Sequence, residues 1–182
     1  QWFGGGQDLT PYYLFEDDAI HFPQTCKIAC DKHNPEFYPK YKARCDEYFW
    51  NSHRNEARGL GGLFFDYCKA SDDISMQNWY DFVTEVGDSF LEAYVPITEK
   101  RKDLPYTQDH RNWQEIRRGR YVEFNLVHDK GTLFGLKTNG RIESILMSLP
   151  PHVQWVYDHH PETGSEEEKI VEVLKHPKQW IN

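Results

Sequence analysis

The segment HRNEARGLGGLFFD, at residues 53–66, constrains the fold more than any other part of this 182-residue chain. Its first half carries Arg54, Glu56 and Arg58 at helix-like spacing, and glycines then break the helical pattern before an apolar, aromatic run. Glycine lets a backbone approach another group closely, and a short apolar run bounded by turn signals is typical of a buried strand. The segment therefore predicts a buried strand over residues 61–68, with charged side chains just before its first residue.

The rest of the chain alternates helical and strand-like patterns. Trp2 and Phe3 lead through three glycines into residues 7–11, and this stretch is expected to be the end of a strand that enters a tight loop. Helices are expected at residues 17–33, 39–54, 74–102, 107–118, 142–149 and 166–176. Strands are expected at 121–127 and 133–137, joined as a hairpin by Asp129-Lys130-Gly131, and at 153–157. This pattern indicates an α+β fold with an antiparallel sheet, in a single domain over residues 1–182.

The composition excludes several classes of protein. The formal net charge of -8 argues against nucleic acid or an anionic membrane as a partner, because both attract positive surfaces. No apolar run approaches the roughly 18 residues that a membrane helix requires, so membrane insertion is not expected. The four cysteines make no disulfide framework, which favours a reducing compartment. Because the chain opens on Gln1 and enters a motif at once, we expect a preceding segment.

The arginines of residues 53–66 suit an anion pocket, since the planar fork of arginine matches a carboxylate. The alternative is that Glu56 pairs with an arginine on a solvated helix end and that the glycines only form a turn. A nucleotide loop is excluded, because Phe64 stands where G-x-G-x-x-G needs its third glycine and no G-K-[ST] follows.

Other polar groups also lie beside flexible backbone. Asp8 follows three glycines, so its carboxylate can reach into a cleft and accept N–H donors, or it can form an ordinary turn. Asp129-Lys130-Gly131-Thr132 and Asn139-Gly140-Arg141 place further charge at turns, where solvated loops are the alternative.

Metal binding and histidine chemistry have weaker support. His21, Cys26, Cys30 and His33 form a candidate metal site, but their spacing matches no specific pattern and buried structural cysteines are common. His53 and His128 are candidates for acid–base chemistry, with packed or exposed bystanders as the alternative.

Four segments together resemble one family, the oxygen-dependent coproporphyrinogen III oxidases. They are WFGGGQDLTP at 2–11, HRNEARGLGGLFFD at 53–66, RRGRYVEFNL at 117–126 and RIESILMSLPP at 141–151. The similarity extends from Trp2 to Trp180. The family signature K-x-W-C-x-x-Y-F is matched by Lys42, Cys45, Tyr48 and Phe49, with Arg44 in place of the usual tryptophan.

The resemblance implies a homodimer with a large, flat antiparallel sheet flanked by helices on both faces. It implies conversion of two propionates of coproporphyrinogen III to vinyl groups, with O2 consumed and CO2 released, to give protoporphyrinogen IX in haem biosynthesis. It also implies that no metal or organic cofactor is needed, because the electron-rich pyrrole assists its own oxidation.

The resemblance assigns roles to individual residues. Asp8, Arg58 and Asp129 match residues that the family requires for activity, and Lys130 stands where the family commonly has arginine. Asn139, Gly140 and Arg141 match its substrate-binding loop. His21 and His53 match proposed metal ligands, but His53 also falls at a position linked to dimer contacts, the role we favour.

Three further expectations follow. The family's proton-donating histidine lies in an H-x-N-x-R strand upstream of the first motif, so this chain is expected to lack part of the active site. The alternatives to an oxidase are a non-catalytic tetrapyrrole-binding or dimerisation module and a metal-dependent hydrolase using His21 and His53. The expected location is the cytosol, with the mitochondrial intermembrane space as the alternative.

Overall fold

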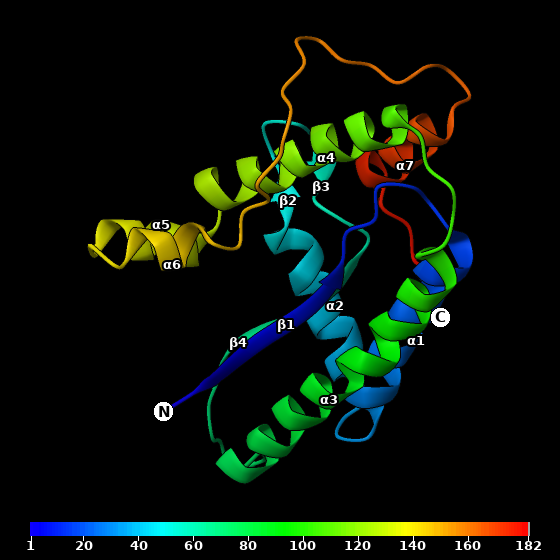
Figure 1. The fold of residues 1–182 in the computed structure, drawn as a ribbon. Coiled ribbons are helices and arrows are strands. Elements are labelled where there is room, and N and C mark those ends of the chain that lie inside the picture. Colours follow the sequence, from blue (N-terminus) through cyan, green and yellow to red (C-terminus); the bar gives the residue numbers. More distant parts are fainter. Residues whose placement is uncertain (182) are drawn as a thin grey trace.

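The computed structural model describes residues 1–181 as an assembly of helices around short antiparallel strands (Figure 1). The strands are β1 (Phe3–Leu9), β2 (Trp50–Asn51), β3 (Glu56–Ala57) and β4 (Gly61–Cys68). The helices are α1 (Glu16–Asp31), α2 (Phe37–Tyr48), α3 (Met76–Arg101), α4 (Gln108–Val127), α5 (Lys130–Lys137), α6 (Ile142–Leu146) and α7 (Glu166–Lys175). The α+β class predicted from the sequence is confirmed.

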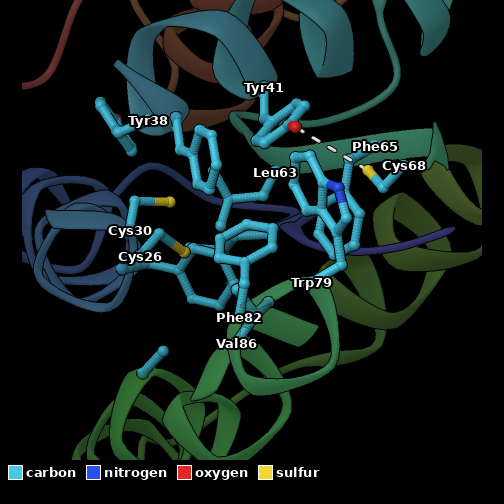
Figure 2. Packing of buried hydrophobic residues seen from close by; sticks show 14 residues of the cluster. Cys26, Cys30, Tyr38, Tyr41, Leu63, Phe65, Cys68, Trp79, Phe82 and Val86 are labelled. Atoms are coloured by element: carbon cyan, nitrogen blue, oxygen red, sulfur yellow. Dashed lines mark hydrogen bonds between the residues drawn. The ribbon is translucent and has the colours of Figure 1, made fainter. Parts of the chain in front are cut away.

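The larger hydrophobic core lies where α1, α2 and α3 pack on the β1–β4 pair (Figure 2). Along β4, Leu63 and Phe65 are buried whereas Phe64 between them is only partly buried, as the two-residue period of a strand requires. Phe82 of α3 lies at the centre, with its ring centroid 5.0 Å from that of Phe65 and 4.9 Å from that of Phe37. Aromatic burial on this scale is the main force holding the three helices to the strands.

A second core joins α4 to α7 at the other end of the molecule (Figure 1). Trp113 and Ile116 of α4 pack with Ile170 and Leu174 of α7, while α5 and α6 project to one side without a fully buried residue.

Helix α3 shows how local sequence defines its ends. Ser75 and Asn78 form a capping box, so the helix begins at Met76. Trp79, Phe82 and Val86 then recur at helical spacing and are buried. The predicted helices at 17–33, 74–102, 142–149 and 166–176 are likewise confirmed, with ends that differ by a few residues.

The prediction of a hairpin over 121–127 and 133–137 is wrong, because α4 runs on to Val127 and α5 spans the second segment. Val122 and Asn125 continue the buried face of α4, and this helical period outweighs the alternation seen locally. Asp129 accepts a hydrogen bond from the Thr132 N–H at 2.7 Å, so Asp129-Lys130-Gly131 starts a helix instead of turning a hairpin. The predicted strand at 153–157 is irregular and bonds α4 through Gln154 N–H and the Glu115 carbonyl.

The helix expected at 39–54 is also too long. Helix α2 ends at Tyr48, and β2 and β3 form a short antiparallel pair in which Asn51 lies opposite Glu56. Asn55 between them has φ of 52°, a left-handed conformation that asparagine tolerates and that interrupts a helix. Arg54, Glu56 and Arg58 therefore do not share a helical face.

The strands among residues 1–181 form two two-stranded sheets, β1–β4 and β2–β3, and not the large flat sheet that was expected. A wide sheet needs partner strands on both edges, and these residues supply none for β1 or β4 beyond each other. Within the same residues, no helix has both the length and the apolar character required to cross a bilayer. That residues 1–182 form a single domain remains a prediction from the sequence.

Candidate functional site

Asp8 and Arg58 form an ion pair between β1 and the turn that precedes β4. The strand register places Asp8 opposite Gly62, and the Leu60 N–H donates to the Leu9 carbonyl at 2.8 Å, which holds the turn against the end of β1. The side chain of Arg58 is 9% exposed and that of Asp8 is 19% exposed. Because charges attract more strongly away from water, this pair is a defined contact and not a loose surface bridge.

The glycines near Arg58 permit this approach. A Cβ on Gly62 would lie 2.1 Å from the Gln7 carbonyl oxygen, and one on Gly59 would lie 2.5 Å from the Leu9 carbonyl oxygen. Gly61 has φ of +90°, which disfavours any L side chain. The three glycines thus let β1 pack against the turn, and that packing brings the carboxylate of Asp8 to Arg58.

Aromatic rings surround the guanidinium of Arg58. Its Cζ lies 3.8 Å from the centroid of the Phe49 ring, 5.2 Å from that of Phe124 and 5.3 Å from that of Tyr121. Such cation–π contacts stabilise a partly desolvated guanidinium by roughly 1–2 kcal/mol each at most. The Nε atom of Arg58 is buried and has no hydrogen-bond partner among residues 1–181, so the fork retains a donor beyond its contact with Asp8.

The ion pair lines a pocket of about 580 Å³ between β1, α3 and α4. Tyr94, Arg101 and Lys102 of α3 line the same pocket, together with Tyr121 of α4. A second pocket of about 830 Å³ shares Tyr12, Arg101 and Lys102 with it, so the two are contiguous. The first pocket presents one carboxylate (Asp8), three cations (Arg58, Arg101 and Lys102) and three tyrosine rings, a combination that suits an anionic ligand with an extended flat body.

The pocket residues from α3 and α4 were not among those predicted from the sequence. The basic last turn of α3, with Lys100 and Arg101, was a visible signal, because cations favour helix C-termini and often meet anions there. It gave no indication that this turn faces Asp8, since that proximity depends on how α3 packs against β1.

Asp129 and Lys130 lie at the junction of α4 and α5 and do not line the pocket of Asp8. One carboxylate oxygen of Asp129 accepts from the Tyr48 hydroxyl at 3.0 Å, and the other caps α5. The backbone N–H of Lys130 donates to the same hydroxyl at 3.1 Å. Tyr48 therefore joins these two candidate residues to the end of α2.

Asn139, Gly140 and Arg141 connect α5 to α6, the two helices that project to one side (Figure 1), and they do not line the Asp8–Arg58 pocket. Asn139 has φ of 55°, the Gly140 N–H donates to the Gly135 carbonyl at 2.9 Å, and Arg141 precedes the first residue of α6. Asn139 and Arg141 are exposed. The structure thus distributes the predicted site residues among the ion-pair pocket, the α4–α5 junction and the α5–α6 turn.

His53, in the segment between β2 and β3, belongs to a polar cluster that forms against α4. Its ring shares a hydrogen bond of 3.0 Å with His128, and its other nitrogen contacts Glu123 at 2.8 Å. Glu123 also accepts hydrogen bonds from Arg54 and Arg120. Burial alone would raise the pKa of Glu123, but hydrogen bonds from Arg54 and His53 and the charge of Arg120 lower it to about 2.

The two histidines considered as metal ligands contact different helices. His21 Nε2 lies 3.0 Å from the Glu92 carbonyl oxygen on α3, whereas His53 faces α4. Cys26 and Cys30 belong to the larger core, where burial raises the pKa of each thiol to about 12. Among residues 1–181 no three His, Cys, Asp or Glu side chains gather in an arrangement that suits a metal ion.

Glu56 does pair with an arginine, as the alternative interpretation of this segment held, but the pair is buried and does not lie on a solvated helix end. Glu56 lies on β3, and its carboxylate accepts from Arg117 of α4 at 3.1 Å, with both side chains buried. Burial lowers the pKa of Arg117, while the charge of Glu56 opposes that change. The pair fixes α4 to the segment that carries Arg58, because an unpaired buried charge is costly.

Replacing Glu123 by Gln should lower the free energy of unfolding by about 1–3 kcal/mol at pH 7, since it removes charge-assisted hydrogen bonds. The folded pKa of about 2 lies below the ordinary value of 4.5, so the contribution is full above pH 4.5 and is lost towards pH 2. Denaturant unfolding of both proteins from pH 7 to pH 3 measures this. Glu47→Gln, at a side chain 75% exposed, is the control, and a difference that does not shrink with acid would contradict the assignment.

Comparison with known proteins gives one consistent result. The family model described as coproporphyrinogen III oxidase matches residues 1–180. The oxygen-dependent coproporphyrinogen-III oxidase of Francisella philomiragia is 57% identical over 99% of this chain and 57% of its own length. The chloroplastic coproporphyrinogen-III oxidase 1 of Arabidopsis thaliana is 56% identical over 99% of this chain and 46% of its own. The chain therefore spans about half the length of these curated relatives, and it belongs to the coproporphyrinogen III oxidase family.

Proposed function

We propose that the protein containing this chain is an oxygen-dependent coproporphyrinogen III oxidase of haem biosynthesis. In each of two steps, a propionate loses CO2, one proton and two electrons to become a vinyl group, and O2 accepts the electrons. The observation that carries the proposal is the Asp8–Arg58 pair in an open pocket, within a chain that matches this family from residue 1 to 180.

The ion pair has the chemistry that a porphyrinogen requires. The pyrrole rings present N–H donors and the propionates present carboxylates, so Asp8 suits the ring centre and Arg58 suits the periphery. Asp8 and Arg58 pair with each other, and Arg58 Nε, which has no partner among residues 1–181, is a donor that a ligand can use. Binding would exchange the contact between Asp8 and Arg58 for contacts to the ligand, which limits the desolvation penalty of leaving either charge unpaired.

Other pocket residues extend this interpretation. Arg101 is held by Asp17 and Asp18, whereas Lys102 pairs only with its exposed neighbour Asp103 among residues 1–181. We assign Lys102 to a second propionate, because its ammonium can leave Asp103 at little cost. Tyr94 and Tyr121 supply flat apolar surface for the macrocycle.

Asp129, Lys130, Asn139, Gly140 and Arg141 complete the site in this proposal. Their location outside the Asp8–Arg58 pocket requires that a ligand, or a movement of α5 and α6, bridge the two regions. Helices α5 and α6 have no fully buried residue, so few contacts oppose such a movement.

The activity is tested on the complete gene product, supplied with coproporphyrinogen III in air and under argon. We expect protoporphyrinogen IX and CO2 to form only with O2, and chelator-treated, metal-free protein to retain turnover, because we propose that no metal or organic cofactor takes part. Absence of product together with absence of O2 uptake would overturn the proposal and favour a non-catalytic module. Loss of activity on metal removal would favour a metal-dependent reaction.

Arg58→Lys should lower kcat/KM on the order of 100-fold while leaving the protein folded. Lysine keeps the charge but loses the planar fork and the stacking on Phe49, and small errors in substrate position are costly. Steady-state kinetics measure the change, and far-ultraviolet circular dichroism checks the fold. Arg44→Lys is the matched control, because Arg44 is 37% exposed and does not line this pocket. Equal rates for both variants would remove Arg58 from the site.

We propose that the active protein is a homodimer with His53 near the contact. Large apolar side chains on α5 and α6, such as Phe134 at 69% and Ile142 at 57% exposure, support association with another surface. Sedimentation velocity of the complete protein is expected to give twice the mass of one chain, and a monomer at all concentrations would contradict this. We propose the cytosol as its location, with the mitochondrial intermembrane space as the alternative; cell fractionation separates them.

A further inference from the structure

Tyr48 lies where α2 ends, between the β1–β4 sheet and the junction of α4 with α5. Its ring stacks on Phe64 of β4, with centroids 4.2 Å apart and planes at 18°. It also meets Phe49 and Phe124 edge to face, at 4.9 and 5.8 Å. Three aromatic neighbours thus fix the ring, and therefore fix where its hydroxyl group points.

The hydroxyl group of Tyr48 makes two hydrogen bonds to the α4–α5 junction. It donates to Asp129 Oδ1 at 3.0 Å and accepts from the Lys130 backbone N–H at 3.1 Å. The other carboxylate oxygen, Oδ2, accepts from the Thr132 N–H at 2.7 Å. Each carboxylate oxygen of Asp129 therefore accepts a hydrogen bond from a different donor, and the two bonds together fix the orientation of the carboxylate.

The contacts assign different tasks to the ring and the hydroxyl of Tyr48. A phenylalanine would make the same stack on Phe64, so the core does not need the hydroxyl group. The group also stays protonated at neutral pH, because burial, partly offset by the Lys130 N–H, raises the pKa of Tyr48. It is a permanent donor to Asp129.

We infer that Tyr48 is a positioning residue for the reaction. Its hydroxyl group orients the carboxylate of Asp129 and the backbone at Lys130, and the aromatic cluster of Tyr48, Phe49, Phe64 and Phe124 relates that orientation to Arg58. This role rests on the proposed function. Arg58 contacts the cluster directly, since its Cζ lies 3.8 Å from the Phe49 centroid and 5.2 Å from the Phe124 centroid.

The first test is Tyr48→Phe in the complete gene product. We expect kcat to fall roughly 10- to 100-fold with KM unchanged, because the carboxylate is misplaced while the substrate pocket at Arg58 is intact. Tyr41→Phe is the matched control: Tyr41 lies on the same helix, and its hydroxyl contacts only Cys68 Sγ, at 3.8 Å, among the described residues. A kcat for Tyr48→Phe equal to that of Tyr41→Phe would overturn the inference.

The second test asks whether the hydroxyl group of Tyr48 acts through Asp129. Tyr48→Phe should lower the denaturation midpoint of the wild-type protein, and should lower it much less when Asp129 is already alanine. Equal shifts in the two backgrounds would show that the hydroxyl does not act through Asp129, and would overturn the inference. Wild-type turnover is measured alongside the kinetics of the Tyr48→Phe protein. Its absence would contradict the proposed function, whereas normal wild-type turnover with unchanged Tyr48→Phe kinetics would contradict only the role of Tyr48.

Discussion

The close approach of β1 to the turn at residues 58–62 is the contact on which the candidate site depends. It exists because glycine occupies the places where the two backbones meet, where a Cβ would lie as little as 2.1 Å from a carbonyl oxygen. The same approach sets the strand register that brings Asp8 to Arg58. A side chain at Gly62 would therefore disturb both the sheet and the ion pair.

The aromatic cluster of Tyr48, Phe49, Phe64 and Phe124 connects the Asp8–Arg58 pair to the junction of α4 with α5. Tyr48 and Phe49 lie at the end of α2, Phe64 lies on β4 and Phe124 lies on α4, so the cluster joins three separate parts of the chain. Arg58 packs on one part of the cluster, and Asp129 is bound through the hydroxyl of another. An aromatic ring is a large rigid body positioned by only two side-chain torsions, so closely packed rings leave one another little freedom to move.

Polar contacts on α4 complete the arrangement. Arg117 pairs with buried Glu56, and Glu123 pairs with Arg54, Arg120 and His53, so one helix holds residues 53–56, which lead into Arg58. Arg54, Glu56 and Arg58 thus make their shortest ion pairs with different residues: Arg54 with Glu123, Glu56 with Arg117, and Arg58 with Asp8. Neighbours in sequence contribute to different interactions here.

Local patterns predicted the elements whose signals were strong and self-contained. The strand at 61–68 follows from an apolar run bounded by glycine, and α3 follows from a long series of apolar residues at helical spacing. The second half of α4 was misread as a strand because YVEFNLV alternates over a short window. Its true period became visible only where Val122 and Asn125 met the rest of the molecule.

The sequence by itself determined the family resemblance and the α+β class, and it predicted Asp8 and Arg58 as site residues, since these depend on residue identity and short-range spacing. Only the tertiary structure decided that Asp8 and Arg58 are partners, that Arg101 and Lys102 share their pocket, and that Asp129 is bound to Tyr48. Those contacts join residues from 43 to 94 positions apart in the chain, and such distances close only when helices and strands bury their apolar faces against one another. The segment at 53–66 is charged by its sequence, but the fold chooses the partner of each charge.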